Sequence, residues 1–157
     1  MNVRECFDKG LLIKARVSEE TIKSTLNLAT HHIGRARGNL RIGYFDVTFT
    51  LAYQSMLHAA RALVFNDGVK ERSHICVVLY LKEKYRQDPQ VTKYLNILDS
   101  YRIGRHEVVY RGGYVSKEEG IRAIKDAEDF LKLTRNVLGV RRRKLKSLAP
   151  HYATGEG

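Results

Sequence analysis

The chain has 157 residues, of which 43% are hydrophobic and 29% are charged. This length and apolar content suit one domain with one core and exclude general disorder. The longest purely apolar run, residues 75–81, is too short to span a bilayer, and the charged N-terminus lacks the apolar core of a signal peptide, so we expect a cytoplasmic protein without a membrane segment. The net charge of +11 favours an anionic partner.

No pattern typical of a metal or cofactor site is present in the sequence. Cys6 and Cys76 match no metal-ligand spacing and are too few for a disulfide scaffold, so we interpret them as unremarkable cysteines of a reducing compartment. His58 and His74 belong to no metal-binding pair. There is no P-loop, dinucleotide fingerprint or nucleophile elbow. We therefore expect neither a metal nor a cofactor.

The first long helix is predicted to begin after Ser18. Residues 1–17 before it indicate a short helix or a docked arm. Ser18 and the two glutamates that follow are typical of a helix start. Apolar residues then recur every three or four positions, at Ile22, Leu26, Ala29, Ile33, Ala36 and Leu40. No acid occurs between Thr21 and Phe45, so the outer face is basic and is either a solvated face or a phosphate track, with Lys23, Arg35, Arg37 and Arg41.

Two further helices are predicted in the middle of the chain. After a break at Gly43, apolar residues lie nearly all round the helix expected over 44–65, which indicates a central, buried helix. Residues 66–68 are a turn signal, and Ser73 can cap a helix that ends near Tyr85 or Arg86. The run 75–81 is also compatible with a strand, because its β-branched residues favour sheets.

A fourth helix is predicted from Asp88 and Pro89, which suit the cap and the first helical position, to the stop at 112–113. Its buried stripe of Val91, Leu95 and Leu98 continues onto Arg102, Arg105 and Val109. Buried guanidinium groups need partners, so this face must meet an anion, a carboxylate, a cleft or another subunit. The alternatives are an ordinary salt-bridged face with Asp99 and Glu107 as partners, or a hairpin over 107–115.

A capping box of Ser116 and Glu119 opens the fifth helix, with Ile121, Ile124, Ala127, Leu131 and Leu138 inward and Gly139 at its end. The predicted fold is all-α, an up-and-down bundle of about five helices in one domain over 1–140, followed by a basic C-terminal tail over 141–157. The expected core consists of Leu26, Ile33, Phe49, Met56, Leu63, Leu95, Leu98, Ile124 and Leu131.

Residues 52–65, AYQSMLHAARALVF, with NDGV at 66–69 and Ser-His at 73–74, resemble the central helix and following turn of HEPN-domain proteins. The resemblance covers about 18–138 and implies a small helical bundle. Many HEPN proteins are metal-independent endoribonucleases, and a number are toxins paired with a nucleotidyltransferase antitoxin. Their signature is an arginine, usually a polar residue after it, and a histidine after four to six intervening residues, with two copies brought together in a dimer.

Carried onto this chain, the signature places its arginine at Arg105 and its polar residue at His106. Tyr110 stands where the histidine is expected, and pairing Arg102 with His106 leaves only three intervening residues. Metal-free RNA cleavage needs a base, an acid and a cation for the charged transition state. Arginine can supply the cation, whereas a tyrosine phenol is a poor base at neutral pH.

These observations define the candidate residues and three functions. The catalytic candidates are Arg105, His106 and Tyr110, and the binding candidates are Arg102, Arg105, Arg111, Tyr114, Arg141, Arg142, Arg143 and Lys144. The functions are an RNA- or nucleotide-binding protein with a degenerate motif, an active endoribonuclease toxin, and an interaction module that partners a nucleotidyltransferase. We also expect a homodimer that joins the ends of the fourth helices, where Gly104 would permit close approach.

Overall fold

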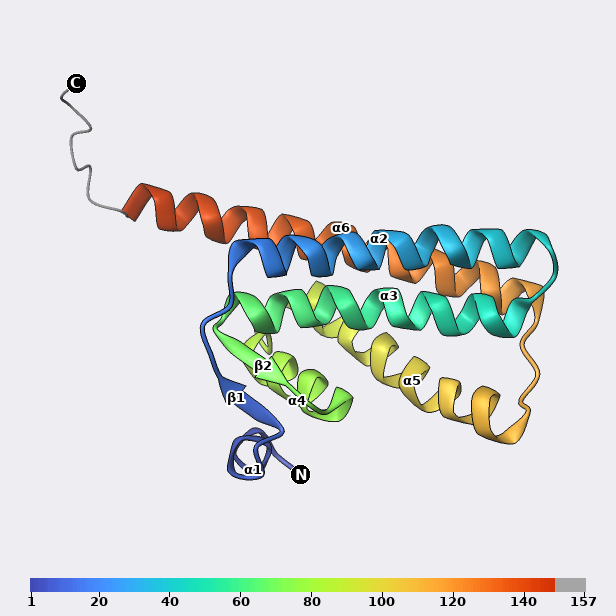
Figure 1. Cartoon of the computed structure of the whole chain (residues 1–157), viewed down its shortest axis with the longest axis horizontal. Coiled ribbons are helices and arrows are strands. Elements are labelled where there is room, and N and C mark those ends of the chain that lie inside the picture. Colours follow the sequence, from blue (N-terminus) through green and yellow to red (C-terminus); the bar gives the residue numbers. More distant parts are fainter. Residues whose placement is uncertain (149–157) are drawn as a thin grey trace, which may run out of the picture.

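The structure is a computed structural model that describes the backbone of residues 1–148 and the side chains of residues 1–139. Within this part of the chain there are six helices and a two-stranded sheet (Figure 1). In chain order they are α1 (Val3–Asp8), β1 (Leu12–Lys14), α2 (Glu19–Arg41), α3 (Phe45–Asn66), β2 (Val69–Glu71), α4 (His74–Lys84), α5 (Pro89–Arg111) and α6 (Lys117–Leu148). The predicted all-α bundle is confirmed.

The predicted helix starts are confirmed by their side-chain caps. Ser18 Oγ accepts the Thr21 amide, and Asp88 Oδ1 accepts the amides of Gln90 and Val91 at 3.1 Å each. The predicted capping box is also formed: Ser116 Oγ accepts the Glu119 amide while Glu119 Oε2 accepts the Ser116 amide. Each cap satisfies amides that have no partner within their own helix.

The central helix is α3, as its apolar composition predicts. Figure 1 shows it between α2 and α6 on one side and α4 and α5 on the other. Small residues such as Ala52 and Ala59, both fully buried, let the neighbouring helices approach it closely. The predicted core is confirmed except that Leu26 is only partly buried, and Ile121, expected inward, is 47% exposed.

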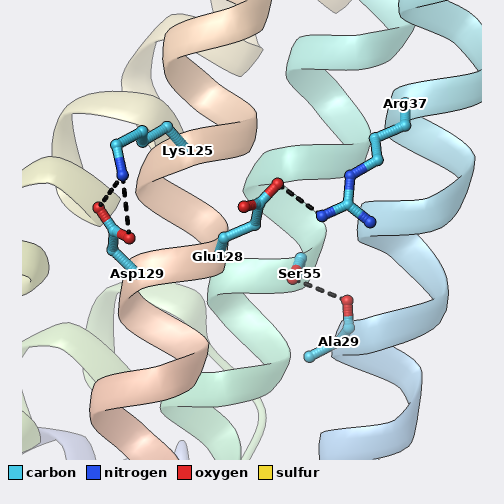
Figure 2. Close-up of polar contacts among 6 residues, drawn as sticks. All are labelled: Ala29, Arg37, Ser55, Lys125, Glu128 and Asp129. Atoms are coloured by element: carbon cyan, nitrogen blue, oxygen red, sulfur yellow. Dashed lines mark hydrogen bonds and ion pairs between the residues drawn. The ribbon is translucent and has the colours of Figure 1, made fainter.

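Polar contacts also tie α2, α3 and α6 together (Figure 2). Buried Ser55 Oγ on α3 donates to the Ala29 carbonyl of α2 at 2.8 Å. Arg37 on α2 forms an ion pair of 2.7 Å with Glu128 on α6. The ion pair and the hydrogen bond thus join α2 to both of these neighbouring helices.

The N-terminal arm docks in a way that the sequence did not predict. β1 pairs antiparallel with β2, with Leu12 opposite Glu71. A disulfide joins Cys6 of α1 to Cys76 of α4, and both cysteines are fully buried. The interpretation of these cysteines as unremarkable is therefore wrong. Cys6 is the buried residue of α1, so the bond fastens this short helix to the bundle.

The predicted stop of the fourth helix at 112–113 is confirmed, whereas the predicted end of the last helix is wrong. The hairpin alternative over 107–115 fails because α5 continues to Arg111 and ends where Gly112 adopts a left-handed conformation, with φ of 64°. α6 does not end at Gly139 but continues to Leu148. The predicted basic tail over 141–157 begins inside this helix, and its last nine residues, 149–157, lie outside the described part of the chain.

Candidate functional site

A pocket of about 500 Å³ lies where α3, the start of α4 and the second half of α5 meet. Its polar lining consists of Tyr53 from α3, Ser73 and His74 from α4 and its cap, and Arg102, Arg105, His106 and Glu107 from α5. The predicted arginine-bearing face of α5 therefore meets a cleft. Its polar residues come from three segments that are distant in the sequence.

Arg105 differs from Arg102 in this pocket because it has no ion pair with another described residue. Its guanidinium lies over the Tyr53 ring, with 5.7 Å from Cζ to the ring centroid. Among the described residues, no acceptor meets its buried Nε and no carboxylate lies within ion-pair distance. A buried donor without an acceptor costs about 1–3 kcal/mol, so this group is ready to receive an anion.

Arg102 is half-buried and is held differently. Its Nε donates to Asp99 Oδ1 at 3.0 Å, one turn earlier on α5. The salt-bridged alternative thus applies to Arg102, and also to Arg111, which pairs with Glu107 at 3.2 Å. Arg105 forms no such salt bridge with a described residue. This difference distinguishes Arg105 from Arg102 and Arg111.

Tyr53 and His74 form a hydrogen-bonded pair in the pocket, with 2.9 Å between Tyr53 Oη and His74 Nδ1. Burial lowers the pKa of His74, Glu71 opposes this, and Arg105 is the foremost of three arginines that lower the pKa further. Burial raises the pKa of Tyr53. The imidazole is therefore neutral at neutral pH, and it can accept a proton or donate a hydrogen bond.

The start of α4 adds donors to the same pocket. Ser73 Oγ accepts the Cys76 amide, and within the described residues no protein group accepts the amides of His74 and Ile75. Both residues line the pocket. Free amides and the positive end of the helix dipole favour an anion here, beside two arginines.

Of the other predicted site residues, only some lie in the pocket. His106 lines the pocket, and its ring lies against that of Tyr110, with centroids 4.9 Å apart. Tyr110 itself is 69% exposed and lies outside the pocket lining, as does Arg111. Tyr114 is 86% exposed and borders a different pocket. The side chains of the predicted basic residues at the C-terminus, Arg141, Arg142, Arg143 and Lys144, lie outside the described ones.

Sequence reasoning missed Tyr53 and His74 as site residues. Both stood out as polar residues, Tyr53 in an otherwise apolar helix and His74 directly after a capping serine. Only the fold brings them to Arg105, because the three positions belong to three different helices.

A second, mostly apolar pocket of about 630 Å³ lies against α5 and the start of α6, with Phe49, Tyr101, Val108 and Val115 in its lining. Gly104 also borders it, and a Cβ at this position would lie 3.1 Å from Phe49 Cζ. The glycine therefore permits close packing of α5 on the chain's own α3. Gly104 therefore no longer supports the expectation that two subunits approach each other closely at this position.

Two histidines stack beside the site, between α2 and α3. The rings of His32 and His58 are parallel within 3°, with centroids 5.1 Å apart. Burial, followed by Arg61, His32 and His74, lowers the pKa of His58 to about 4. Burial, followed by Arg35 and His31, also lowers the pKa of His32. Both rings are therefore neutral at neutral pH.

This pair predicts acid sensitivity. Because an unfolded histidine has a pKa of about 6.5, the unfolded chain binds more protons than the folded chain between about pH 6.5 and pH 4. The free energy of unfolding should be fully retained above about pH 6.5 and should fall on the order of 1–2 kcal/mol toward pH 5, after allowance for solvent screening. Urea unfolding at several pH values measures it. His58→Gln should flatten the dependence, and a constant free energy in the parent would contradict the assignment.

Within the described residues, there is no group of three or more histidine, cysteine, aspartate or glutamate side chains that could hold a metal ion. No described helix has both the length and the apolar character needed to cross a bilayer.

Comparison with protein families gives one result that bears on this site. The model of the HEPN domain matches residues 9–137, which include every element that builds the pocket. None of the curated proteins compared with the chain matches it.

Proposed function

Because the chain belongs to the HEPN-domain family, as the match over most of its length shows, we propose that it binds RNA or a nucleotide through phosphate at the pocket between α3, α4 and α5. The observation that carries this proposal is Arg105, a half-buried guanidinium whose Nε has no acceptor among the described residues. A phosphate would satisfy that donor with a charge-assisted hydrogen bond.

The neighbouring groups support phosphate over an uncharged ligand. Arg102 lies one turn before Arg105, and His74 and Ile75, whose amides have no acceptor among the described residues, line the same pocket. The Tyr53–His74 pair gives the pocket a neutral hydrogen-bonding wall, and Glu107, the carboxylate in the lining, pairs with Arg111 rather than with Arg105. These groups together resemble an anion site built from backbone and guanidinium donors.

The basic residues Arg141, Arg142, Arg143 and Lys144 belong to the proposal as a second, electrostatic contribution to RNA binding. Anisotropy of a labelled RNA in EDTA, measured at several salt concentrations, tests both parts. Affinity should fall steeply with salt, and truncation after Gly139 should weaken binding and flatten the salt slope. If the truncated protein binds RNA as tightly as the parent, the basic residues do not contribute to binding. If the parent does not bind RNA, the proposal is refuted.

A second candidate function is metal-independent cleavage of RNA, and the presence of two imidazoles beside two arginines favours it. His74 and His106 both line the pocket of Arg102 and Arg105. Attack of a 2′-hydroxyl on phosphorus needs a base for its proton and an acid for the leaving oxygen, while a guanidinium stabilises the charge. The His74 tautomer that donates from Nδ1 to Tyr53 leaves Nε2 as the proton acceptor.

Cleavage of RNA in EDTA by matched variants tests this candidate. His74→Gln and His106→Gln should each lower the cleavage rate by about 100-fold or more while RNA binding is retained, because general acid–base catalysis contributes 100-fold to 10,000-fold. Tyr110→Phe should cleave like the parent, since Tyr110 lies outside the pocket lining. Absence of cleavage by the parent leaves binding alone as the function.

The partner proposals rest on the exposed apolar residues of α5, namely Ile103, Val109 and Tyr110. They support either a homodimer through the ends of the two α5 helices or docking of a nucleotidyltransferase antitoxin. Light scattering at micromolar concentration distinguishes a dimer from a monomer. A monomeric mass would refute the homodimer. Co-purification with a nucleotidyltransferase encoded beside this chain would favour a toxin pair.

A further inference from the structure

The cations on the described faces differ in whether a carboxylate of the chain pairs with them. On the side formed by α2 and α6, Arg37 pairs with Glu128 (Figure 2). On the side formed by α2, α3 and α5, Arg61 pairs with Glu71, and on α5 Asp99 pairs with Arg102 and Glu107 with Arg111. Arg35 and Arg105 on this second side have no ion-pair partner among the described residues, so they are the arginines that a ligand can meet without displacing a carboxylate.

The groups on this second side form a continuous row, which we call the cationic strip: Arg35 and His32 on α2, His58 and Arg61 on α3, His74 on α4, and Arg105 on α5. Ring stacking joins His32 to His58 across α2 and α3. After burial, Arg35 is the next cause that lowers the pKa of His32. Arg61 and His74 both lower the pKa of His58. Arg105 lowers the pKa of His74. Arg35 follows His32 by three residues on α2, and Arg61 follows His58 by three residues on α3, so each arginine shares a helix face with its histidine. Each histidine of the strip therefore has an arginine of the strip beside it.

The strip begins in the pocket and leaves it. α3 lies between α2 and α5 in Figure 1, so the strip crosses α3 from one neighbouring helix to the other. The axes of packed helices lie about 8–10 Å apart, and the strip spans two such separations between α2 and α5. A mononucleotide is too short to contact both ends, whereas a single strand of several nucleotides can. Arg35 is exposed and has no ion-pair partner among the described residues.

Resting on the proposed function, we infer that the ligand of this pocket is single-stranded RNA longer than one nucleotide, and that its backbone crosses α3 along the cationic strip to a second phosphate subsite at Arg35 and His32. Arg35 supplies the charge of this subsite at neutral pH. The neutral rings of His32 and His58 supply polar edges and aromatic surface without adding repulsion between cations.

Two ligands and three variants test the inference. Uridine monophosphate reaches only the pocket, and hexauridylate reaches both subsites. Arg35→Ala should weaken hexauridylate about fivefold and reduce its salt slope by about one, while uridine monophosphate binds as to the parent. Arg105→Ala should weaken both ligands. Lys132→Ala, the same loss of charge in the groove between α2 and α6, is the matched control and should change neither affinity by more than its general effect on net charge.

The outcomes are distinguishable. If Arg105→Ala weakens both ligands but Arg35→Ala binds hexauridylate as tightly as the Lys132→Ala control does, the second subsite is refuted and the proposed function stands. If the parent binds neither ligand, both fail. If polyglutamate binds as tightly as hexauridylate and with the same dependence on Arg35, the strip binds acidic protein and the inference of RNA is overturned. Because Arg35 is exposed, its replacement should leave the helical circular dichroism signal unchanged.

Discussion

Arg105→Ala is expected to weaken uridine monophosphate binding by about 2 kcal/mol, or about 30-fold, because it removes a charge-assisted contact to phosphate in a partly desolvated pocket. The guanidinium lies over the Tyr53 ring and has no carboxylate partner among the described residues, so its removal breaks no ion pair within the protein. Isothermal titration calorimetry in EDTA measures the difference, and circular dichroism shows whether the variant folds.

Arg111→Ala is the matched control for this experiment. Arg111 lies on the same helix and carries the same charge, but it is exposed, lies outside the pocket lining and pairs with Glu107. A general loss of positive charge would weaken binding equally in both variants. A specific site requires a much larger loss for Arg105→Ala, and equal losses would remove Arg105 from the proposed site.

Reduction of the Cys6–Cys76 disulfide is expected to lower the free energy of unfolding by about 2–4 kcal/mol. The two cysteines are 70 residues apart, so the bond removes much conformational freedom from the unfolded chain. Guanidinium unfolding with and without dithiothreitol measures the change. The double variant Cys6→Ala, Cys76→Ala should unfold at the same denaturant concentration in both conditions, and a parent insensitive to dithiothreitol would contradict the prediction.

Much of the bundle could be predicted because its signals are local. Ser18, Asp88 and the Ser116–Glu119 box mark helix starts through hydrogen bonds to amides a few residues away. The all-round apolar character of 44–65 likewise indicated the central helix before its neighbours were known. Gly139 misled because a single glycine inside a long helix costs only about 1 kcal/mol relative to alanine, which the rest of α6 can offset.

Features that depend on distant segments could not be read from the sequence. β1 and β2 have three residues each, too few for a period to be visible, and the disulfide forms because α1 docks on α4. The candidate site likewise combines residues that a local pattern indicated with residues that only the packing of helices brings together. The stripe on α5 pointed to Arg102 and Arg105, but the contribution of Tyr53 and His74 depends on how α3 and α4 pack against that helix.

A nuclear magnetic resonance titration of nitrogen-15-labelled protein with uridine monophosphate tests the phosphate site most directly, because it reports on the Arg105 side chain and on the backbone amides at once. The account predicts saturable shifts of the Arg105 Nε–Hε signal and of the His74 and Ile75 amides, and no comparable shift of the Arg37 Nε–Hε signal, whose guanidinium is paired with Glu128. Saturable shifts that leave Arg105, His74 and Ile75 unchanged, or no shifts at millimolar ligand, would contradict it.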